Sequence, residues 1–218
     1  MKNEQPIPIA IATRNKGKTA EIHHLIEGYP VLIKNLDDFG PIPEVKEDGD
    51  TFDDNAYKKA SFTARVLGVP ALADDSGLIV DALDGAPGVH SARFAGKNAT
   101  DRDRCRKLLE AMQNQESRSA AFACVISIAV PSGPALTYEG RCEGVLTREP
   151  QGENGFGYDP IFFYPPLNKT FAQLTREEKS RVSHRGKALR EVRREFDKVL
   201  KWIRIHMPVD EKFNCGPQ

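Results

Sequence analysis

The sequence predicts an α/β protein with a mixed β-sheet, and two patterns indicate this class. Short apolar runs alternate with segments whose apolar residues recur every three or four positions, which is typical of strands alternating with amphipathic helices. Residues 120–130 and 135–148 are predicted to be long strands that only Pro131-Ser132-Gly133-Pro134 separates. So short a connection implies antiparallel neighbours, and a purely parallel sheet is not expected.

The N-terminal third is predicted to contain two strands and two helices. Residues 7–12 form an apolar run typical of a buried strand, and residues 18–27 carry apolar side chains at helical spacing before a glycine. A second, short strand is expected at residues 31–33. Thr51, with an acid three residues later, is typical of a capping box, and the helix that follows is expected to end at Gly68.

The middle of the chain is predicted to hold a bent strand pair, a loop and a helix. Residues 70–73 and 78–80 are apolar, and Asp74-Asp75-Ser76-Gly77 between them predicts a bend. Residues 85–96 carry several glycines and predict a long loop. Residues 100–112 predict a helix that its first residue caps.

A basic amphipathic helix is predicted near the C-terminus, with Ser183 as its N-cap. Its Lys and Arg residues fall away from one apolar stripe that would face the core. No internal repeat or linker is evident, so we expect residues 1–206 to form a single domain and residues 207–218 a polar tail. The stripe consists of Leu189, Val192, Phe196, Val199 and Ile203.

The formal charge sums to zero but is unevenly distributed. Thirty-one Lys and Arg residues balance 31 Asp and Glu residues, which argues against a general nucleic-acid-binding protein. Residues 37–54 hold eight acids and one lysine, a net of −7, whereas residues 176–206 hold eleven basic and five acidic residues, a net of +6. A cleft between such segments would suit a cation together with a polyanion.

Composition and patterning predict a cytoplasmic protein that has no membrane partner. The N-terminal apolar run is too short for a signal peptide, and the longest apolar stretch, residues 122–130, is far below the roughly 18 residues of a membrane span. The four cysteines lie at least 18 positions apart. We therefore expect reduced thiols rather than a disulfide or a zinc site.

A polar loop directly follows the first predicted strand: Thr13-Arg14-Asn15-Lys16-Gly17-Lys18. Open α/β sheets bind phosphates at the carboxyl ends of strands, where hydroxyl, amide and ammonium groups converge with the amides of the next helix. With a single glycine this is not a Walker A sequence. A strand-to-helix turn with solvated lysines is the alternative.

Two adjacent carboxylates, Asp74 and Asp75, stand between apolar segments. Successive side chains of a strand point to opposite faces, so at most one of the two faces a given pocket. That carboxylate would serve as a Mg²⁺ ligand or as a general base for water, with Glu44, Glu47 or Asp48 as a second ligand. The alternative is an Asx-type turn in an ordinary hairpin.

Two further motifs carry groups suited to a flat, oxygen-rich ligand. Gly155-Phe156-Gly157-Tyr158-Asp159-Pro160 places rings between glycines, so we expect Phe156 or Tyr158 to stack on the ligand. A β-bulge with core aromatics is the alternative. Ser183-His184-Arg185-Gly186 opens the C-terminal helix, and a glycine in the first turn favours close approach of a ligand over a simple cap.

Taken together and in order, these motifs resemble the inosine triphosphate pyrophosphatase family, the dITP/XTP/ITP diphosphatases. The similarity covers residues 7 to about 205. The chain departs from the family pattern at Arg14, where a small residue is also common, and beyond residue 205. The matching motifs are residues 13–18, Glu47 with Thr51-Phe52, Asn55-Ala56 and Lys59, residues 73–78, Ala86-Pro87-Gly88 with Ser91-Ala92-Arg93, and residues 155–160, 174–180 and 183–186.

The resemblance implies a two-lobed α/β fold with a long, curved, mixed β-sheet flanked by helices, an active-site cleft between the lobes, and usually a homodimer. It implies Mg²⁺-dependent cleavage of a purine nucleoside triphosphate into the monophosphate and pyrophosphate. Asp75 would accept a proton and share the metal with Glu47, although the alignment leaves Glu44 open. Phosphate would bind residues 13–18 and Lys59, and the nucleotide would bind Ser76, Phe156, Gly157, Tyr158, Asp159, Lys179, His184 and Arg185.

Selectivity is expected to depend on the purine 6-position. Donors from Arg185 or His184 would pair with the 6-oxo group of ITP, dITP or XTP, but would face the 6-amino donor of ATP. Three other classes stay open: a pyrophosphatase for modified pyrimidine nucleotides, a non-catalytic nucleotide sensor, and a nucleic-acid-binding protein that uses the basic helix.

Overall fold

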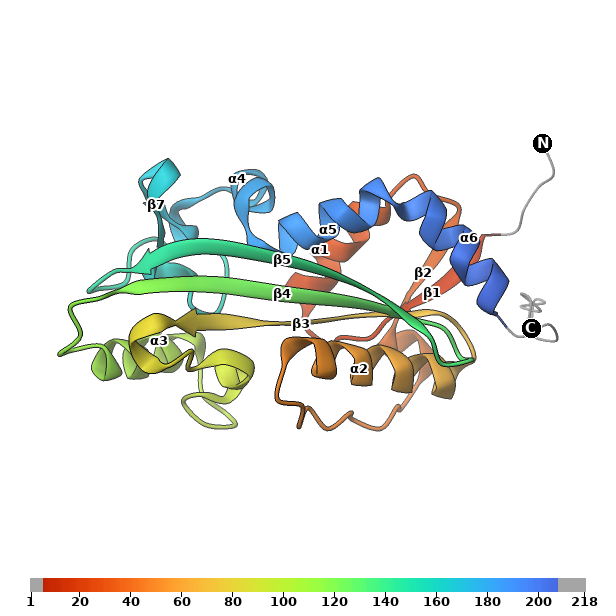
Figure 1. Cartoon of the computed structure of the whole chain (residues 1–218), viewed down its shortest axis with the longest axis horizontal. Coiled ribbons are helices and arrows are strands. Elements are labelled where there is room, and N and C mark those ends of the chain that lie inside the picture. Colours follow the sequence, from red (N-terminus) through yellow and green to blue (C-terminus); the bar gives the residue numbers. More distant parts are fainter. Residues whose placement is uncertain (1–5, 208–218) are drawn as a thin grey trace. The chain divides into compact units, whose positions relative to one another are not determined.

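The structure, a computed structural model, describes residues 6–207 of the 218-residue chain. Seven strands within these residues form one mixed sheet in the order β2-β1-β3-β4-β5-β6-β7 (Figure 1). β1 pairs in parallel with β2 and β3, whereas β6 pairs antiparallel with β5 and β7, which confirms the predicted mixed sheet. The strands are β1 (Ile7–Ile11), β2 (Val31–Asn35), β3 (Ala71–Val80), β4 (Ser119–Ala129), β5 (Ala135–Leu146), β6 (Phe162–Tyr164) and β7 (Lys169–Thr170).

Helices connect and accompany these strands. The α-helices of the described residues are α1 (Lys16–Ile26), α2 (Phe52–Leu67), α3 (Asp101–Ala111), α4 (Arg176–Val182), α5 (His184–Arg194) and α6 (Phe196–His206). Between residues 6 and 207 no helix combines the length and apolarity that crossing a membrane requires.

The chain separates into two compact units. Unit 1 contains the residues up to Asp75, residues 125–138 and the residues from Leu189 onward, and unit 2 contains residues 76–124 and 139–188. The boundary therefore falls inside β3, between Asp75 and Ser76. This division agrees with the predicted two-lobed fold, whereas the cleft between the lobes stays a prediction.

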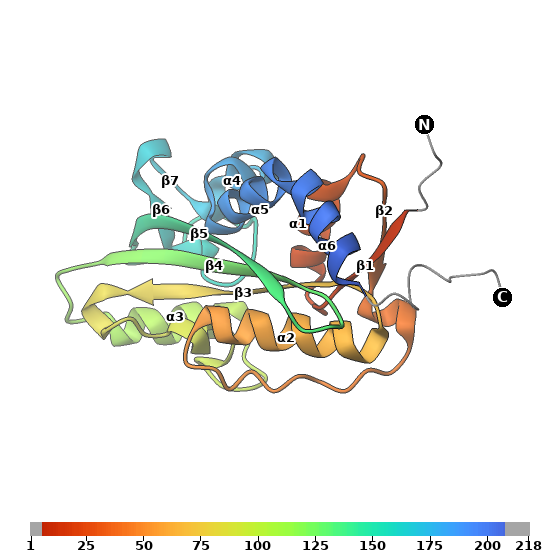
Figure 2. The same cartoon turned by 45° about the vertical axis from the view of Figure 1, so that its right-hand side comes forward.

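Small side chains fill much of the interior of unit 1. Because alanine carries no atoms beyond Cβ, α2 packs closely against the strands of this unit (Figures 1 and 2). This close packing lets a lysine on α2 reach a carboxylate on β3. The alanine cluster contains Ala10, Ala12, Ala60, Ala64, Ala71, Ala73 and Ala129.

Aromatic rings occupy the core of unit 2. Phe122 on β4 packs against Phe162 on β6 with ring centroids 4.6 Å apart, and Phe162 packs against Phe171 at 4.7 Å. The ring of His184 stacks on Phe122 at 4.7 Å with an interplanar angle of 14°. The aromatic core thus holds the first residue of α5 in place.

The predicted bend at residues 74–77 is wrong, because β3 runs without interruption from Ala71 to Val80. Asp and Gly residues favour turns only where no other interaction determines the backbone conformation. Here Asp74 and Asp75 each form an ion pair with a lysine, so an extended backbone holds both carboxylates. The alternative of an ordinary hairpin turn is excluded by the same observation.

The single C-terminal helix predicted from Ser183 is divided in the structure. The hydroxyl oxygen of Ser183 accepts a hydrogen bond from Gly186 N at 3.1 Å, as a cap would, but α5 ends at Arg194 and α6 begins at Phe196. The intervening Glu195 has non-helical angles, φ −106° and ψ 8°. All five residues of the predicted apolar stripe are nevertheless buried. Since the stripe continues across the break, apolar spacing gave no sign of it.

Several short elements lie where the sequence predicted loops or nothing. The predicted loop at 85–96 contains a 3₁₀ helix, Gly88–Arg93. The short strands β6 and β7 and the helix α4 were not anticipated. Met207 is buried, so the packed chain extends one residue beyond the expected boundary at 206, and residues 208–218 of the predicted tail lie outside the described residues.

Candidate active site

The polar loop after β1 is organised by Asn15, which caps α1. Its side-chain oxygen accepts hydrogen bonds from Gly17 N at 2.9 Å and from Lys18 N at 3.2 Å. The hydroxyl oxygen of Thr13 accepts one from Asn15 N at 3.2 Å. The predicted strand-to-helix turn is therefore present, and its hydroxyl, amide and lysine groups are gathered at the start of α1.

Arg14 and Lys16 are the two remaining basic residues of this loop, and the structure describes the side chain of Arg14 only. The guanidinium of Arg14 is exposed, lies 3.1 Å from Asp37 and donates to the carbonyl oxygen of Ile42. Arg14 thus holds the acidic segment that follows β2. The side chain of Lys16, also predicted to bind phosphate, lies outside the part of the chain that the structure describes.

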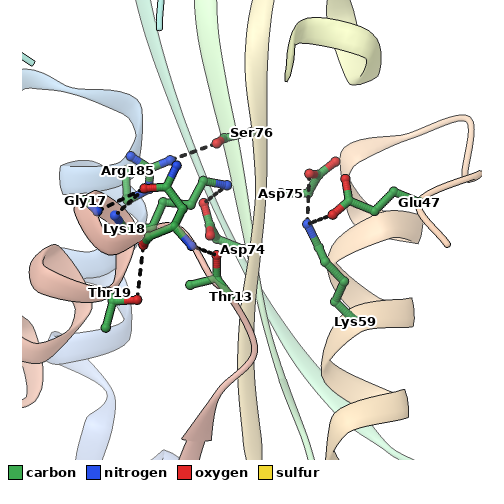
Figure 3. A network of polar contacts seen from close by, with 11 residues as sticks. Thr13, Gly17, Lys18, Thr19, Glu47, Lys59, Asp74, Asp75, Ser76 and Arg185 are labelled. Carbon is green, nitrogen blue, oxygen red and sulfur yellow. Dashed lines mark hydrogen bonds and ion pairs between the residues drawn. The ribbon is translucent and has the colours of Figure 1, made fainter. Parts of the chain in front are cut away.

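Two lysines pair with the adjacent carboxylates of β3. Lys18 Nζ lies 2.9 Å from Asp74 Oδ2, and Lys59 Nζ lies 3.0 Å from Asp75 Oδ1 and 3.1 Å from Glu47 Oε1 (Figure 3). Neighbouring side chains of a strand point to opposite faces, which explains why α1 supplies one lysine and α2 the other. We call these five residues the lysine–carboxylate cluster. All of them belong to unit 1.

The charges of this cluster set its proton affinities. When ionised, the three carboxylates of this cluster lie against two ammonium groups. Burial raises the pKa of Asp75, and Lys59 and Lys18 only partly oppose this rise. Burial by itself would lower the pKa of Lys59, but the charges of Asp75, Asp74 and Glu47 together raise it. Asp75 is thus a better proton acceptor than an ordinary aspartate.

The cluster also fits a magnesium ion. Asp75 Oδ2 is buried, and no hydrogen-bond donor within residues 6–207 reaches it, so this oxygen is available as a ligand. The side chain of Glu47 is 38% exposed, which leaves room for water or phosphate oxygens. No three His, Cys, Asp or Glu side chains of the described residues are grouped around one point. Mg²⁺ needs no such group, because it takes one or two carboxylates together with waters and substrate phosphate.

Among the three carboxylates considered as second metal ligand, the geometry favours Glu47. It shares Lys59 with Asp75, whereas Asp48 pairs with Lys46 at 3.0 Å and Lys58 at 2.9 Å, and Glu44 is exposed.

Asn55 on α2 fixes the segment that carries Glu47. Its side-chain oxygen accepts from Gly49 N at 2.8 Å, and its amide donates to Gly49 O at 3.4 Å. Asn55 is fully buried. The sequence showed Asn55 only as part of the motif after Thr51, and no local pattern revealed that its buried amide holds the backbone at Gly49.

A second group of predicted residues gathers in unit 2. Arg185 is 2% exposed, and its Nη2 donates to the hydroxyl oxygen of Ser76 at 2.8 Å (Figure 3). Its guanidinium lies 5.6 Å from the centroid of the Phe156 ring, and Lys179 Nζ lies 4.5 Å from the same centroid. Two cations therefore face one aromatic ring that is itself only partly buried.

Lys179 and Asp159 form a buried ion pair. Asp159 Oδ2 also accepts a hydrogen bond from Phe156 N at 2.8 Å. Burial raises the pKa of Asp159, and the charge and hydrogen bond of Lys179 oppose that rise. Both residues were predicted to hold the nucleotide. The structure shows them neutralising each other and ordering the backbone at Phe156.

For two residues of these motifs, packing inside the protein decides between the interpretations. Tyr158 is 3% exposed and donates to Ser91 O at 2.9 Å, so its ring belongs to the core and only Phe156 is placed to stack on a ligand. Gly186 is explained by packing rather than by a ligand. A Cβ at this position would lie 1.8 Å from Ser180 O, so only glycine lets α5 start directly after α4.

The protein is an α/β protein with two groups of polar residues: the lysine–carboxylate cluster at β3, and Arg185 and Lys179 at the ring of Phe156 in unit 2. These groups suit a ligand that carries phosphates and an aromatic ring. The chain belongs to the Ham1 family, whose model matches residues 9–195. This confirms the family relationship expected from the order of the motifs.

Relatives and solved structures agree with this assignment. The chain is 63% identical to a dITP/XTP pyrophosphatase of Syntrophobacter fumaroxidans over 95% of this chain and 89% of that protein. It is 56% identical to one of Desulfotalea psychrophila over 89% and 87%. A solved Ham1 protein from Coxiella burnetii superposes with a TM-score of 0.84 at 43% identity and covers 88% of this chain and 99% of that one.

Proposed function

We propose that this chain hydrolyses non-standard purine nucleoside triphosphates (dITP, ITP and XTP) to the nucleoside monophosphate and pyrophosphate. Family membership and the dITP/XTP pyrophosphatase names of relatives up to 63% identical support this reaction. The reaction would remove deaminated purines from the nucleotide pool.

The observation that carries the proposal is the buried carboxylate of Asp75. Its pKa is raised by burial, and Lys59 holds one of its two oxygens. Hydrolysis forms a P–O bond to the oxygen of water, breaks the bond between the α and β phosphates, and releases one proton. Asp75 Oδ2 accepts that proton, because burial has increased its proton affinity. Lys59, held on Oδ1 of the same carboxylate, keeps Asp75 in position.

The phosphates would bind unit 1. Lys18 and Lys59 supply positive charge, and the loop from Thr13 to Lys18 supplies hydroxyl, amide and backbone groups. Glu47 and Asp75 would hold Mg²⁺. When bound there, Mg²⁺ would neutralise phosphate charge and polarise the bond to be cleaved.

The nucleoside would bind unit 2. Phe156 offers a partly exposed ring for stacking, and Arg185 offers a guanidinium whose N–H groups can only donate. A 6-oxo purine accepts from such a donor, whereas a 6-amino purine sets donor against donor. Leaving a buried polar group unpaired costs about 1–3 kcal/mol, which favours ITP, dITP and XTP over ATP.

We further propose that the enzyme works in the cytoplasm as a homodimer. The homodimer rests on the family relationship. The cytoplasmic location rests on the widely spaced cysteines, which favour reduced thiols.

The proposal is tested by measuring pyrophosphate release from dITP, XTP, dUTP and dTTP, with Mg²⁺ and with excess chelator. We expect equimolar monophosphate and pyrophosphate from dITP and XTP, and loss of turnover with chelator. Release of inorganic phosphate with a diphosphate would contradict the bond assignment. Preference for dUTP or dTTP would favour a pyrimidine enzyme, and binding without turnover would favour a nucleotide sensor.

A further inference from the structure

One glycine of the loop that carries Phe156 is held through both of its backbone polar groups. Gly157 N donates to Asp101 Oδ2 at 2.8 Å, and the carbonyl oxygen of Gly157 accepts from Cys105 Sγ at 3.3 Å. Asp101 and Cys105 are four positions apart on α3 and therefore lie on the same face of that helix. All three residues belong to unit 2.

The carboxylate that holds Gly157 is itself oriented. Asp101 Oδ1 lies 3.2 Å from Arg104 Nη1, and that nitrogen also donates to Ala99 O at 2.8 Å. One oxygen of Asp101 thus serves Arg104, and the other is directed at the amide of Gly157. A hydrogen bond from an amide to an ionised carboxylate is stronger than one between neutral groups.

The thiol completes the contact as a donor. Burial raises the pKa of the Cys105 thiol to about 12, so the sulfur keeps its hydrogen at neutral pH. Gly157 has φ +65°, a conformation that residues with a side chain rarely adopt. We call the two hydrogen bonds from Asp101 and Cys105 to Gly157 the α3 clamp. This clamp fixes a backbone conformation that few other residues would tolerate.

This clamp determines where Phe156 lies. The amide of Phe156 donates to Asp159 on one side, and the next residue, Gly157, is held by α3 on the other. With both amides fixed, the ring of Phe156 is held next to Lys179 and Arg185, at 4.5 Å and 5.6 Å from its centroid.

Helix capping does not explain Asp101. The capping hydrogen bonds of α3 are made by Thr100 and Asp103, whose side chains each accept from the other's backbone amide. Asp101 and Asp103 both lie in the first turn, and each pairs with an arginine. Only Asp101 contacts the loop of Phe156, so its role differs from that of its neighbour.

We propose that Asp101, assisted by Cys105, is a positioning residue that sets the Phe156 loop for recognition of the base. This inference rests on the proposed function, because it assigns the base to Phe156 and Arg185. In this role Asp101 would contact neither the base nor the phosphates. It acts through the backbone of Gly157, so it determines affinity for the nucleoside and leaves the chemical step to unit 1.

The test compares Asp101→Ala with Asp103→Ala and Asp101→Asn. Asp101 has a side chain that is 47% exposed, so its removal should be tolerated by the fold. We expect Asp101→Ala to raise KM for dITP about tenfold, the scale of one lost charge-assisted hydrogen bond, with kcat within about threefold. Asp101→Asn keeps an acceptor oxygen and should recover most of the affinity. Asp103→Ala should leave KM unchanged, although it weakens the cap of the same helix.

Hydrogen–deuterium exchange provides a readout that does not depend on activity. The amide of Gly157 should exchange faster in Asp101→Ala than in wild type, and Asp103→Ala should match wild type there. Cys105→Val, which removes the thiol donor at similar volume, should raise KM in the same direction by a smaller factor.

Three results would overturn the clamp: an unchanged KM and unchanged exchange in Asp101→Ala, an equal rise of KM in Asp103→Ala, or a loss confined to kcat. A wild-type protein that does not hydrolyse dITP would instead refute the proposed function. In that case the exchange at Gly157 still decides whether Asp101 orders the loop.

Discussion

Buried charged side chains have different surroundings in the two units of this protein. In unit 1, small alanines bring α2 close to the strands, and three carboxylates lie against the ammonium groups of Lys18 and Lys59. In unit 2, the ring of Phe156 lies against Arg185 and Lys179, and Lys179 forms an ion pair with Asp159 in which the two charges balance. We therefore propose that unit 1 supplies the reacting groups and unit 2 the groups that recognise the base.

The largest effect should come from Asp75→Asn, which removes the proposed proton acceptor. The amide keeps the shape of the carboxylate but loses its proton affinity and its charge. Loss of a general base costs about 10²–10⁴-fold in turnover, so kcat for dITP should fall at least that far. Steady-state kinetics with thermal denaturation as a folding control will measure it. Near-normal turnover by the folded variant would remove Asp75 from the reaction.

Lys18→Ala should reduce stability as well as activity. Asp74 is 0% exposed, so removing Lys18 takes away the charge opposite a buried carboxylate, a change that typically costs about 3–5 kcal/mol. Lys58→Ala is the matched control, because its partner Asp48 is partly exposed, and such surface pairs contribute about 0–1 kcal/mol. Urea denaturation of both variants tests this. Equal losses would show that the Lys18 pair is no more than a surface contact.

Lys59→Ala should impair turnover more than binding of the nucleoside. Lys59 is the only residue of the lysine–carboxylate cluster with contacts to both Glu47 and Asp75, so its removal frees two carboxylates to repel each other and the phosphates. We expect kcat/KM for dITP to fall at least about tenfold, the effect of roughly 1.4 kcal/mol. An unchanged kcat/KM in both Lys18→Ala and Lys59→Ala would place the phosphate elsewhere.

Arg185→Ala should narrow selectivity instead of abolishing chemistry. Without the guanidinium, kcat/KM for ITP should fall much more than kcat/KM for ATP, because only the 6-oxo purine loses a hydrogen bond. The expected change in their ratio is about 10-fold, within the 1–3 kcal/mol of one unpaired buried group. Competition between the two substrates measures the ratio directly. Equal losses on both would make Arg185 a structural or phosphate contact.

The smallest effect is a dependence of thermal stability on pH, which comes from two buried thiols of unit 2. Burial raises the pKa of Cys105 to about 12 and of Cys142 to about 11, and both thiols lie in unit 2. Because the folded pKa exceeds the unfolded value near 9, these thiols favour the folded state fully below pH 9 and lose that contribution as pH rises toward 11–12. Tm should therefore fall less steeply above pH 9 in Cys142→Ala than in wild type. Parallel curves would contradict this.

The fold class could be predicted from the sequence, whereas the hydrogen-bond and ion-pair partners of the candidate site residues could not. Residue type and order were enough for the mixed sheet, for α2 and for the five-residue apolar stripe, because periodicity reports burial directly. The bend at residues 74–77 was predicted wrongly, since local turn preference carries no information about the distant lysines that keep β3 extended. Ion pairs between residues far apart in the chain are not visible in one sequence.

Contacts between residues far apart in the chain also decide the roles of Gly186 and Tyr158 in unit 2. A glycine beside a ligand and a glycine beside another helix look identical in sequence, so the sequence could not decide between these two causes at Gly186. Tyr158 and Phe156 are equivalent in the motif, and only the packing against Ser91 places Tyr158 in the core. The contacts of Asp101 and Asn55 with distant backbone groups gave no local pattern at all.

The central proposal is that this chain hydrolyses 6-oxo purine nucleoside triphosphates in preference to 6-amino ones. The most direct test is the ratio of kcat/KM for dITP to kcat/KM for dATP in the wild-type protein with Mg²⁺, followed as pyrophosphate release. A ratio of at least about 10² is predicted, the effect of roughly 2.7 kcal/mol from donors that cannot pair with a 6-amino group. A ratio near one, with both substrates cleaved between the α and β phosphates, would contradict the account.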